Sequence, residues 1–336
     1  MEPGNETGVS GFILLGLSRE PGTQRLLFVV FLGLYVVTAL GNLLIVLAVG
    51  SDPRLHSPMY FFLANLSFAD VGLTSATVPK MLADLRTQSP TIPYAGCLAQ
   101  LYFFMTFGAL DDFLLATMAY DRFVAICHPL RYATAMSPWR CGLLLTVCWG
   151  LTSLAALVHT LLLSRLSFCA DNPAIPHFFC DLAPLLPLSC SDPTLNWVML
   201  LIVGTMVLVA PLGLILGSYA RIVAAVLRVP SAGGKRRAFS TCGSHLAVVS
   251  LFYGTAVAVY LCPPSSRSAG KDRIAAVLYT AVTPLLNPFI YSLRNRDLHR
   301  ALRRALWTQD RHCVLHRALR NRHLHQSLHW ALQRAP

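Results

Sequence analysis

The chain has 336 residues, of which 55% are hydrophobic and only 12% are charged, and its mean hydropathy is +0.56. Soluble domains carry roughly 25% charged residues, so this composition excludes an ordinary water-soluble domain and favours a protein whose solvent is lipid. The formal net charge of +12 is spread over short segments rather than along one soluble face, and it therefore disfavours a nucleic-acid partner.

Seven apolar stretches are long enough to cross a hydrocarbon layer of about 30 Å, which takes about 20 helical residues. We therefore predict an all-α membrane protein, a seven-transmembrane helical bundle. Residues 1–25 form an N-terminal tail without the basic start and apolar run of a cleavable signal peptide, so the first span is expected to act as the anchor. The bundle over residues 26–293 is assigned spans near residues 26–49, 59–81, 99–126, 141–163, 197–227, 239–261 and 274–293.

The basic residues set the expected orientation. With the N-terminus outside the cell, 19 of the 27 Lys and Arg residues fall in cytoplasmic segments, as the positive-inside rule requires. We therefore predict a multi-pass plasma-membrane protein with an extracellular N-terminus and a cytoplasmic C-terminus. The triplet Asn5-Glu6-Thr7 is an N-glycosylation sequon in the predicted outer tail, which makes Asn5 the expected glycosylation site.

Cysteines gather in the outer segments. Cys97 lies at the mouth of the third span, and Cys169, Cys180 and Cys190 lie in one long loop over residues 164–196. An oxidising exterior lets such residues form disulfides. Four cysteines allow three connectivities, and the spacing does not choose between them. A long loop within a compact architecture is usually functional, and this one is expected to form a stapled lid over the bundle.

The C-terminal region divides into two parts. Residues 294–307 read as a short cytoplasmic amphipathic helix, with basic residues on one side and apolar ones on the other, which should lie along the inner membrane surface. Residues 308–336 form a basic tail in which no catalytic, binding or metal-ligating pattern is evident.

Polar residues inside the spans are the candidates for function, since such groups are costly in lipid. The alternative is that they only join helices by hydrogen bonds worth about 0.6–2 kcal/mol each. At 1.5 Å per residue, Asp111 lies roughly 21 Å below Cys97 and Arg122 roughly 37 Å below it. Arg122 is thus expected at the cytoplasmic surface, either as a protein contact or as an anchor that reaches lipid headgroups. The other polar positions are Asn42, Asp70, Asp112 and Asn287.

Four motifs in these spans resemble the vertebrate olfactory (odorant) receptors, a rhodopsin-like G-protein-coupled receptor family. The resemblance covers about residues 5–307, and Gly41-Asn42 and Ser218-Tyr219 add to it. Phe123 and Arg237 depart from the usual tyrosine and lysine. The motifs are PMYFFLANLSFAD at 58–70, MAYDRFVAIC at 118–127, RAFSTCGSHL at 237–246 and PLLNPFIYSLRN at 284–295.

The resemblance implies a sensory transducer that binds an odorant and activates a heterotrimeric stimulatory G protein of the olfactory type, raising cAMP. It also implies the disulfides Cys97–Cys180 and Cys169–Cys190. Membrane lipid is a further expected partner. No catalytic residue, metal ligand or resident cofactor is implied, apart from a sodium ion as an allosteric ligand.

Individual residues inherit roles by matching the family's motifs. Asp121 and Arg122 match the acid–arginine pair that guards the G-protein cavity, with Arg122 held by Asp121 at rest. Asp70 and Asp111 match the polar centre that can hold sodium. Asn287, Pro288 and Tyr291 match the NPxxY switch.

The outer halves of spans three to seven should enclose the odorant. Amine receptors place a carboxylate about seven residues after the third-span cysteine, and this chain has Phe104 there. A buried cation would lack a partner, so a small neutral and mainly apolar odorant is expected. The expected ligand-binding residues, each of which could instead only pack the bundle, are Met105, Gly108, Ala109, His159, Gly204, Val207, Tyr253, Val257, Tyr260 and Thr280.

Three other functions compete with this interpretation. An enzyme is disfavoured because the chain has no H-E-x-x-H, no C-x-x-C and no complete phosphate-binding loop. A transporter or channel is disfavoured because no internal repeat is evident and the polar groups stop in the inner half of the bundle. A rhodopsin-like receptor with a non-olfactory small-molecule ligand remains the alternative, because a sequence carries no information on tissue.

Overall fold

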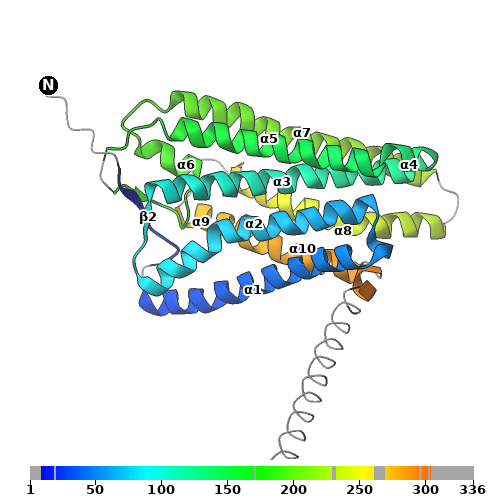
Figure 1. The fold of residues 1–336 in the computed structure, drawn as a ribbon, viewed down its shortest axis with the longest axis horizontal. Coiled ribbons are helices and arrows are strands. Elements are labelled where there is room, and N and C mark those ends of the chain that lie inside the picture. Colours follow the sequence, from blue (N-terminus) through cyan, green and yellow to red (C-terminus); the bar gives the residue numbers. More distant parts are fainter. Residues whose placement is uncertain are drawn as a thin grey trace, which may run out of the picture.

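The computed structural model describes residues 9–18, 20–169, 172–228, 232–260, 269–294, 297–301 and 303. They form an elongated bundle of helices with a small sheet at one end (Figure 1). We call this end the sheet end and the opposite end, where α3 finishes beyond Arg122, the arginine end. The long helices are α1 (Pro21–Ser51), α2 (Pro58–Thr87), α3 (Tyr94–Cys127), α5 (Pro138–Leu163), α7 (Thr194–Leu227), α8 (Ala232–Tyr260) and α10 (Thr283–Arg294).

Shorter elements connect these helices. The first group, at the arginine end, is η1 (Pro53–Leu55), η2 (Pro129–Arg131) and α4 (Tyr132–Ala135). The second group follows α5 along the chain and comprises α6 (Leu182–Leu185) and η3 (Leu186–Leu188). The last helical segment combines α9 (Ala269–Val277), the π-helical turn η5 (Leu278–Val282) and α10.

Proline fixes where several helices begin. Pro21, Pro58 and Pro138 occupy the first position of α1, α2 and α5, where the missing N–H costs nothing and the fixed φ already suits a helix. The helices are consequently longer than the predicted spans: α1 starts at Pro21 instead of Leu26. The apolar window predicted only the part of each helix that lies in hydrocarbon.

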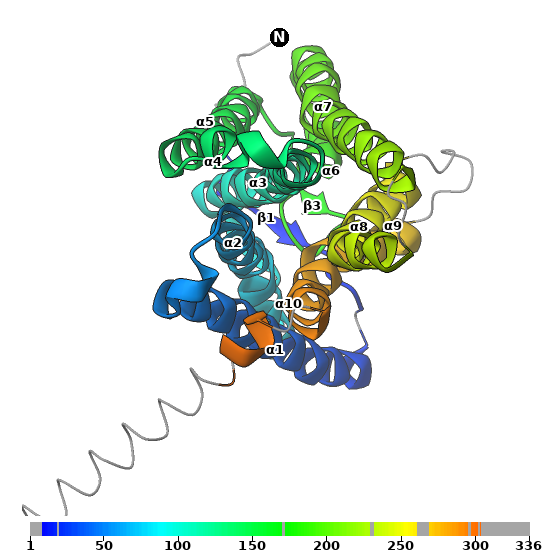
Figure 2. The same cartoon turned by 90° about the vertical axis from the view of Figure 1, so that its right-hand side faces the viewer.

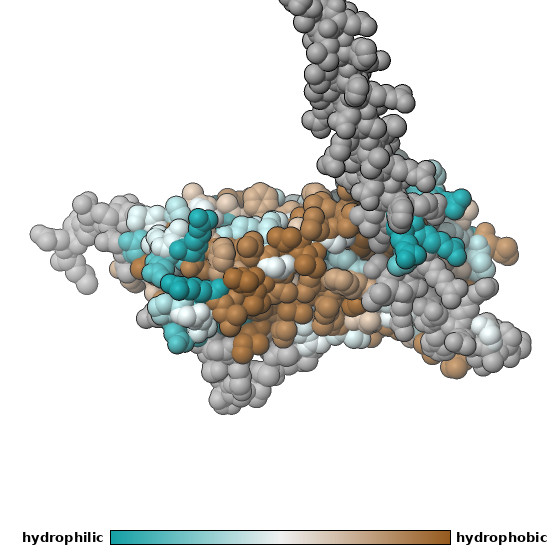
Figure 3. Space-filling view, turned by 90° about the horizontal axis from the view of Figure 1, so that it is seen from below, coloured by the Kyte–Doolittle hydropathy of each residue, from teal (hydrophilic) through white to brown (hydrophobic). Residues whose placement is uncertain are grey.

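Six helical segments of the described chain are long and apolar enough to cross a membrane: α1, α2, α3, α5, α7 and Arg273–Tyr291. α8 has 29 residues, roughly 44 Å, but its first turns carry Lys235, Arg236 and Arg237, which lower its hydropathy. With α8 the predicted seven-helix bundle is confirmed. On the α1 side, hydrophobic residues cover the middle of the surface and hydrophilic ones gather toward both ends (Figure 3), as expected for a membrane protein.

The small sheet was not predicted. β1 (Gly11–Leu14) lies between β2 (Thr91–Pro93), to which it is antiparallel, and β3 (Ala174–Ile175), to which it is parallel. A Cβ on Gly11 would lie 2.5 Å from the Ile92 carbonyl oxygen, so only glycine permits this pairing. The sheet ties the N-terminal tail to the segment before α3 and to the long loop.

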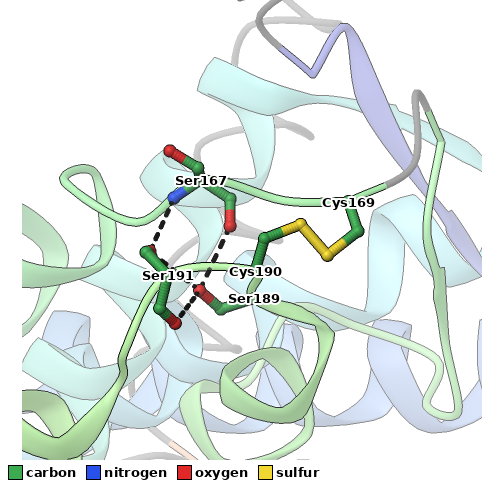
Figure 4. Close-up of a disulfide and its surroundings, with 5 residues drawn as sticks. All are labelled: Ser167, Cys169, Ser189, Cys190 and Ser191. Atoms are coloured by element: carbon green, nitrogen blue, oxygen red, sulfur yellow. Dashed lines mark hydrogen bonds between the residues drawn. A yellow bond between two sulfur atoms is a disulfide. The ribbon is translucent and has the colours of Figure 1, made fainter. Parts of the chain in front are cut away.

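Two disulfides hold the long loop. Cys97, buried at the start of α3, is bonded to Cys180, and Cys169 is bonded to Cys190. This is the pairing that the family resemblance implies. Near the second disulfide, the Ser167 N–H donates a hydrogen bond to the Ser191 hydroxyl (3.0 Å), and the Ser189 hydroxyl donates to the Ser167 carbonyl (3.1 Å) (Figure 4). The loop is therefore fixed both to α3 and to itself.

Gln100 adds a further link between loop and bundle. Its side-chain oxygen accepts a hydrogen bond from the Cys180 N–H (2.8 Å), and its amide group donates to the Ala76 carbonyl of α2 (2.9 Å). Next to Cys180, Phe178 and Phe179 are buried against α1 and α2 residues in one apolar cluster. The loop thus closes the sheet end as a packed lid.

A hydrogen bond to a carbonyl that proline leaves without a donor joins α1 to α10. Pro288 has no N–H, so the carbonyl of Pro284, four residues earlier, has no donor within its own helix. Asn42 of α1 supplies that donor at 3.1 Å. Gly41 makes the approach possible, because a Cβ there would lie 3.2 Å from Pro288. Figure 2 shows α1 and α10 side by side, with α2 next to them.

Part of the predicted amphipathic helix is described. Residues 297–301 and 303 are helical, with Leu298 and Ala301 buried against the arginine end and Asp297 paired with Arg300 at 3.6 Å. The remainder of that segment, the tail 308–336 and the sequon at Asn5 lie outside the described residues.

We predict that Cys97→Ser destabilises the fold more than Cys169→Ser does. The two bonds close loops with sequence separations of 83 and 21 residues, for which chain entropy suggests about 4.5 and about 3.4 kcal/mol. Cys97 is also fully buried, whereas Cys169 is exposed. Thermal unfolding of the purified variants in lipid nanodiscs, together with their cell-surface levels, measures the difference. Equal losses would show that the bond to α3 has no special role.

We also predict that Asp181→Asn changes how stability depends on pH. Burial raises the pKa of Asp181 to about 6, although the Leu182 N–H opposes this by donating to the carboxylate at 2.7 Å. A raised carboxyl pKa stabilises the fold fully below the unfolded value of about 3.9, and this contribution is lost as pH rises through 6. Asparagine still caps α6 but does not ionise. The variant should be more stable than wild type by on the order of 1 kcal/mol at pH 7.5, and equal to it at pH 4, in thermal unfolding; a pH-independent difference would contradict this.

Candidate functional site

A cavity of about 200 Å³ lies between α3, α5 and α7, with single contributions from α2, α8 and η5. It is smaller than the roughly 300–1,000 Å³ of pockets for drug-sized ligands, so it suits a small molecule. Most of its lining is apolar. The lining residues are Leu73, Phe104, Met105, Gly108, Ala109, Asp112, Thr152, Ala155, Ala156, His159, Leu200, Val203, Gly204, Val207, Leu208, Phe252 and Tyr279.

Helical spacing explains why these residues share one space. On α3, Phe104, Gly108 and Asp112 are four residues apart, so they lie one above the other on a single face. The same spacing of three or four relates the lining residues of α5 and of α7. Gly108, Ala109, Ala155, Ala156 and Gly204 leave the volume open, because their side chains are small.

Six of the ten predicted ligand-binding residues line this cavity: Met105, Gly108, Ala109, His159, Gly204 and Val207. Two others, Tyr253 and Thr280, are buried outside the lining. Val257 and Tyr260 belong to α8, but their side chains lie outside the described residues.

The π-helical turn η5 explains the position of Thr280. Counting from the seventh-span motif assumed 3.6 residues per turn, but Leu278–Val282 is π-helical, and such a turn shifts the side chains relative to a regular helix. Thr280 donates to the Ala276 carbonyl at 2.7 Å, and its neighbour Tyr279 reaches the cavity instead.

Aromatic residues close the cavity on the side of the lid. Phe104 packs against Phe179 of the lid, with ring centroids 4.7 Å apart, and against Tyr279 at 6.0 Å. Phe104 is thus an uncharged residue in the wall of the cavity, as the sequence predicts. The cavity is nevertheless not free of carboxylates, because Asp112, two helical turns further along α3, also lines it.

Asp112 connects the cavity to α8. The Tyr253 hydroxyl donates a hydrogen bond to Asp112 Oδ1, so Tyr253 contacts a lining residue although it does not line the cavity. Asp112 Oδ2 is buried and makes no hydrogen bond within the described part of the chain. The sequence placed Asp112 among the functional polar residues but not in the pocket; its spacing of four from Gly108 was the available signal.

A second polar cluster lies between α2, α3 and α10. Both carboxylate oxygens of Asp70 accept from the Asn287 amide group, at 2.9 and 3.1 Å. Asp111 is close enough to Asp70 for their carboxyl groups to interact electrostatically. Asp111 Oδ1 and Asn287 Oδ1 are buried and make no hydrogen bond among the described residues. These hard oxygen donors are the kind that alkali and alkaline-earth cations prefer.

The third cluster surrounds Arg122 at the arginine end. Arg122 is only 4% exposed, and its Nη1 donates to the Tyr219 hydroxyl (3.3 Å) and to the Cys242 carbonyl (3.5 Å). The Tyr219 hydroxyl also bonds His245 Nδ1 (2.8 Å), whose Nε2 lies 3.0 Å from the Leu115 carbonyl. If Nε2 carries the proton, the Tyr219 hydroxyl donates to Nδ1 and Nε2 donates to the Leu115 carbonyl. Arg122 Nε is buried and makes no hydrogen bond among the described residues. This series of hydrogen bonds joins α3, α7 and α8.

The expected pairing of Arg122 with Asp121 is wrong. Among the described residues the structure has no ion pair between them. Asp121 instead accepts a hydrogen bond from the Tyr132 hydroxyl of α4 at 2.9 Å. Adjacent residues of a helix do not face each other, so Arg122 points into the bundle and Asp121 points toward α4.

The NPxxY residues lie between the second and third clusters. Asn287 bonds Asp70, as described above. Pro288 packs near Gly41, and Tyr291 is buried in the central apolar cluster with α2, α3 and α8 residues. The structure thus brings the residues of the predicted switch into the core of the bundle.

Comparisons with known proteins agree on one family. A family model described as olfactory receptor matches residues 31–309. Olfactory receptor 1M1 of Mus musculus is 58% identical over 306 residues, covering 91% of this chain and 97% of its own length. Olfactory receptor 1N2 of Homo sapiens is 60% identical over 298 residues, covering 89% and 94%.

The chain therefore belongs to the olfactory receptor family, a rhodopsin-like family of G-protein-coupled receptors. Membership makes it a multi-pass plasma-membrane receptor with odorants as ligands and a G protein as partner. It is not an enzyme.

We predict that Tyr219→Phe destabilises the bundle by about 1–3 kcal/mol, because it leaves Arg122 and His245 buried with fewer partners. Tyr35→Phe is the matched control: it removes a 3.0 Å hydrogen bond to Ser75 but no charged partner, and should cost less. Thermal unfolding of both purified variants measures this. A loss for Tyr219→Phe no greater than for Tyr35→Phe would show that the Arg122–Tyr219–His245 contacts do not hold the bundle.

Proposed function

We propose that this receptor binds small, neutral, mainly apolar odorants in the cavity between α3, α5 and α7 and activates the olfactory-type stimulatory G protein, raising cAMP. The observation that supports this most strongly is the link from cavity to α8: Asp112 lines the cavity and accepts a hydrogen bond from Tyr253. A ligand that contacts Asp112 therefore acts on the helix that also contacts Arg122.

The proposed signal travels along α8. Tyr253, His245 and Cys242 of α8 contact Asp112, Leu115 and Arg122 of α3 in turn. A ligand that favours a different position of Tyr253 would weaken this series, since ligands shift populations only through contacts that differ between the states. Separation of α8 from α3 would then free the Arg122 guanidinium for carbonyl oxygens of the G protein, which its fixed array of donors suits.

The proposed orientation places the sheet end outside the cell and the arginine end in the cytoplasm. The excess of basic residues in the segments at the arginine end supports it. The disulfides support it as well, because both lie at the sheet end and require an oxidising compartment.

We also propose sodium as an allosteric ligand. Asp70, Asp111 and Asn287 would hold it, and the two buried oxygens of Asp111 and Asn287 without hydrogen bonds fit this role. Within the described chain no group of three or more His, Cys, Asp or Glu side chains is placed to hold a metal ion. A singly charged ion bound by two carboxylates and an amide is consistent with that arrangement.

An odorant panel tests the proposed function. Cells that express the chain should raise cAMP in response to some neutral odorants, and cells that express a variant with Val207→Trp, which fills the cavity, should not at equal surface level. Gly204 and Val207 lie on the same wall of α7, so a large side chain there removes the volume. A receptor that responds best to charged amines, or that is unaffected by filling the cavity, would contradict the proposal.

Arg122→Lys tests the role at the arginine end. Lysine keeps the charge but not the fixed array of donors, so cAMP signalling should fall at least roughly tenfold while surface level and odorant binding persist. The exposed Arg140→Lys is the control and should signal normally. Full signalling by the Arg122 variant would instead support a lipid anchor, a role that the burial of Arg122 already disfavours.

A further inference from the structure

Two residues that line the cavity each have a buried polar atom that makes no hydrogen bond among the described residues. The atoms are Asp112 Oδ2 and His159 Nδ1. Both residues are only 1% exposed, and both line the cavity. A buried polar atom without a partner costs about 1–3 kcal/mol, so each atom is a point at which a ligand gains by forming a hydrogen bond.

The ligand group that fits Asp112 follows from its free oxygen. Oδ1 accepts from Tyr253, and Oδ2 is an acceptor when the carboxyl group is ionised and an O–H donor when it is neutral. A hydroxyl group both donates and accepts, so it can form a hydrogen bond with Oδ2 in either form.

The spacing of the two atoms follows from the helix register. Thr117 of α3 contacts Cys148 of α5 at 3.7 Å, and the two helices run in opposite directions between the sheet end and the arginine end (Figure 1). His159 lies 11 residues from Cys148 toward the sheet end, level with Thr106 of α3. Asp112 therefore lies about six residues, or roughly 9 Å, deeper than His159.

We infer that the preferred odorants are elongated neutral molecules with a hydroxyl group at one end and a second hydrogen-bonding group at the other. The hydroxyl forms a hydrogen bond with Asp112 Oδ2 at the inner end of the cavity, and the second group meets His159 Nδ1 nearer the lid. The apolar middle of the molecule lies along Met105, Gly108, Ala156 and Gly204. This inference rests on the proposed function, which places the odorant in this cavity.

Binding to purified receptor in lipid nanodiscs tests the inference without a G protein. In a series of terminal diols from butanediol to decanediol, affinity should pass through a maximum, because two fixed anchors select one length. The best diol should bind roughly two- to tenfold more tightly than hexanol, the value of one further hydrogen bond. A diol series that rises steadily with length would overturn the inference.

Asp112→Leu sharpens the test. Leucine removes both carboxyl oxygens, so the maximum in the diol series should vanish. Thr106→Val changes another buried polar residue of α3 outside the lining and should keep the maximum. A maximum retained in Asp112→Leu would overturn the assignment. If Asp112→Leu does not fold, the diol series on the unmodified receptor decides.

His159→Phe provides the second arm. It removes the ring nitrogens while retaining an aromatic side chain, so the advantage of the best diol over hexanol should be lost and hexanol affinity should change little. An unchanged diol advantage would overturn the role of His159. Failure of every odorant to bind would refute the proposed function itself, whereas binding without preference for hydroxyl groups refutes only this inference.

Discussion

Hydrogen bonds from buried polar groups of α3 hold α8 in the bundle, and the rest of the signalling arrangement depends on them. In lipid, apolar faces gain little by leaving one solvent for an equally apolar partner, so close packing and interhelical hydrogen bonds decide which helices associate. α8 meets this requirement through Tyr253, His245 and Cys242, which contact Asp112, the Leu115 carbonyl and Arg122. One end of this series lies in the cavity between α3, α5 and α7 and the other at the arginine end. A few hydrogen bonds can therefore couple two distant parts of the receptor.

The same constraint explains the opposite side of the bundle. Pro288 removes a donor from α10, and lipid offers none in exchange, so Asn42 of α1 supplies it. Asn287 and Asp70 join α10 to α2 in a similar way. α1, α2 and α10 are thus joined by hydrogen bonds that involve backbone and side-chain groups. On both sides some buried polar atoms have no hydrogen-bond partner within the described chain: Asn42 Oδ1 and Asn287 Oδ1 here, and Asp112 Oδ2 and His159 Nδ1 at the cavity.

Hydropathy predicted the bundle because a membrane span is a local property of the sequence. The sheet could not be predicted in this way: β1 has only four residues, and its pairing depends on segments roughly 80 and 160 residues away. Six pocket residues were placed by counting along regular helices. Counting failed at Thr280, where the helix becomes π-helical. Motif matching gave the position of Arg122 but paired its side chain with Asp121. A motif shows only that two residues are adjacent in sequence, whereas the direction of each side chain depends on the helix in three dimensions.

A structure of the odorant-bound receptor in complex with its G protein tests the central claim most directly. The account predicts the odorant between α3, α5 and α7 in contact with Asp112. It also predicts that Arg122 no longer contacts Tyr219 and Cys242 and instead faces the G protein, with the inner part of α8 displaced from α3. An odorant bound elsewhere, or a G-protein complex in which Arg122 keeps its bonds to Tyr219 and Cys242, would contradict it.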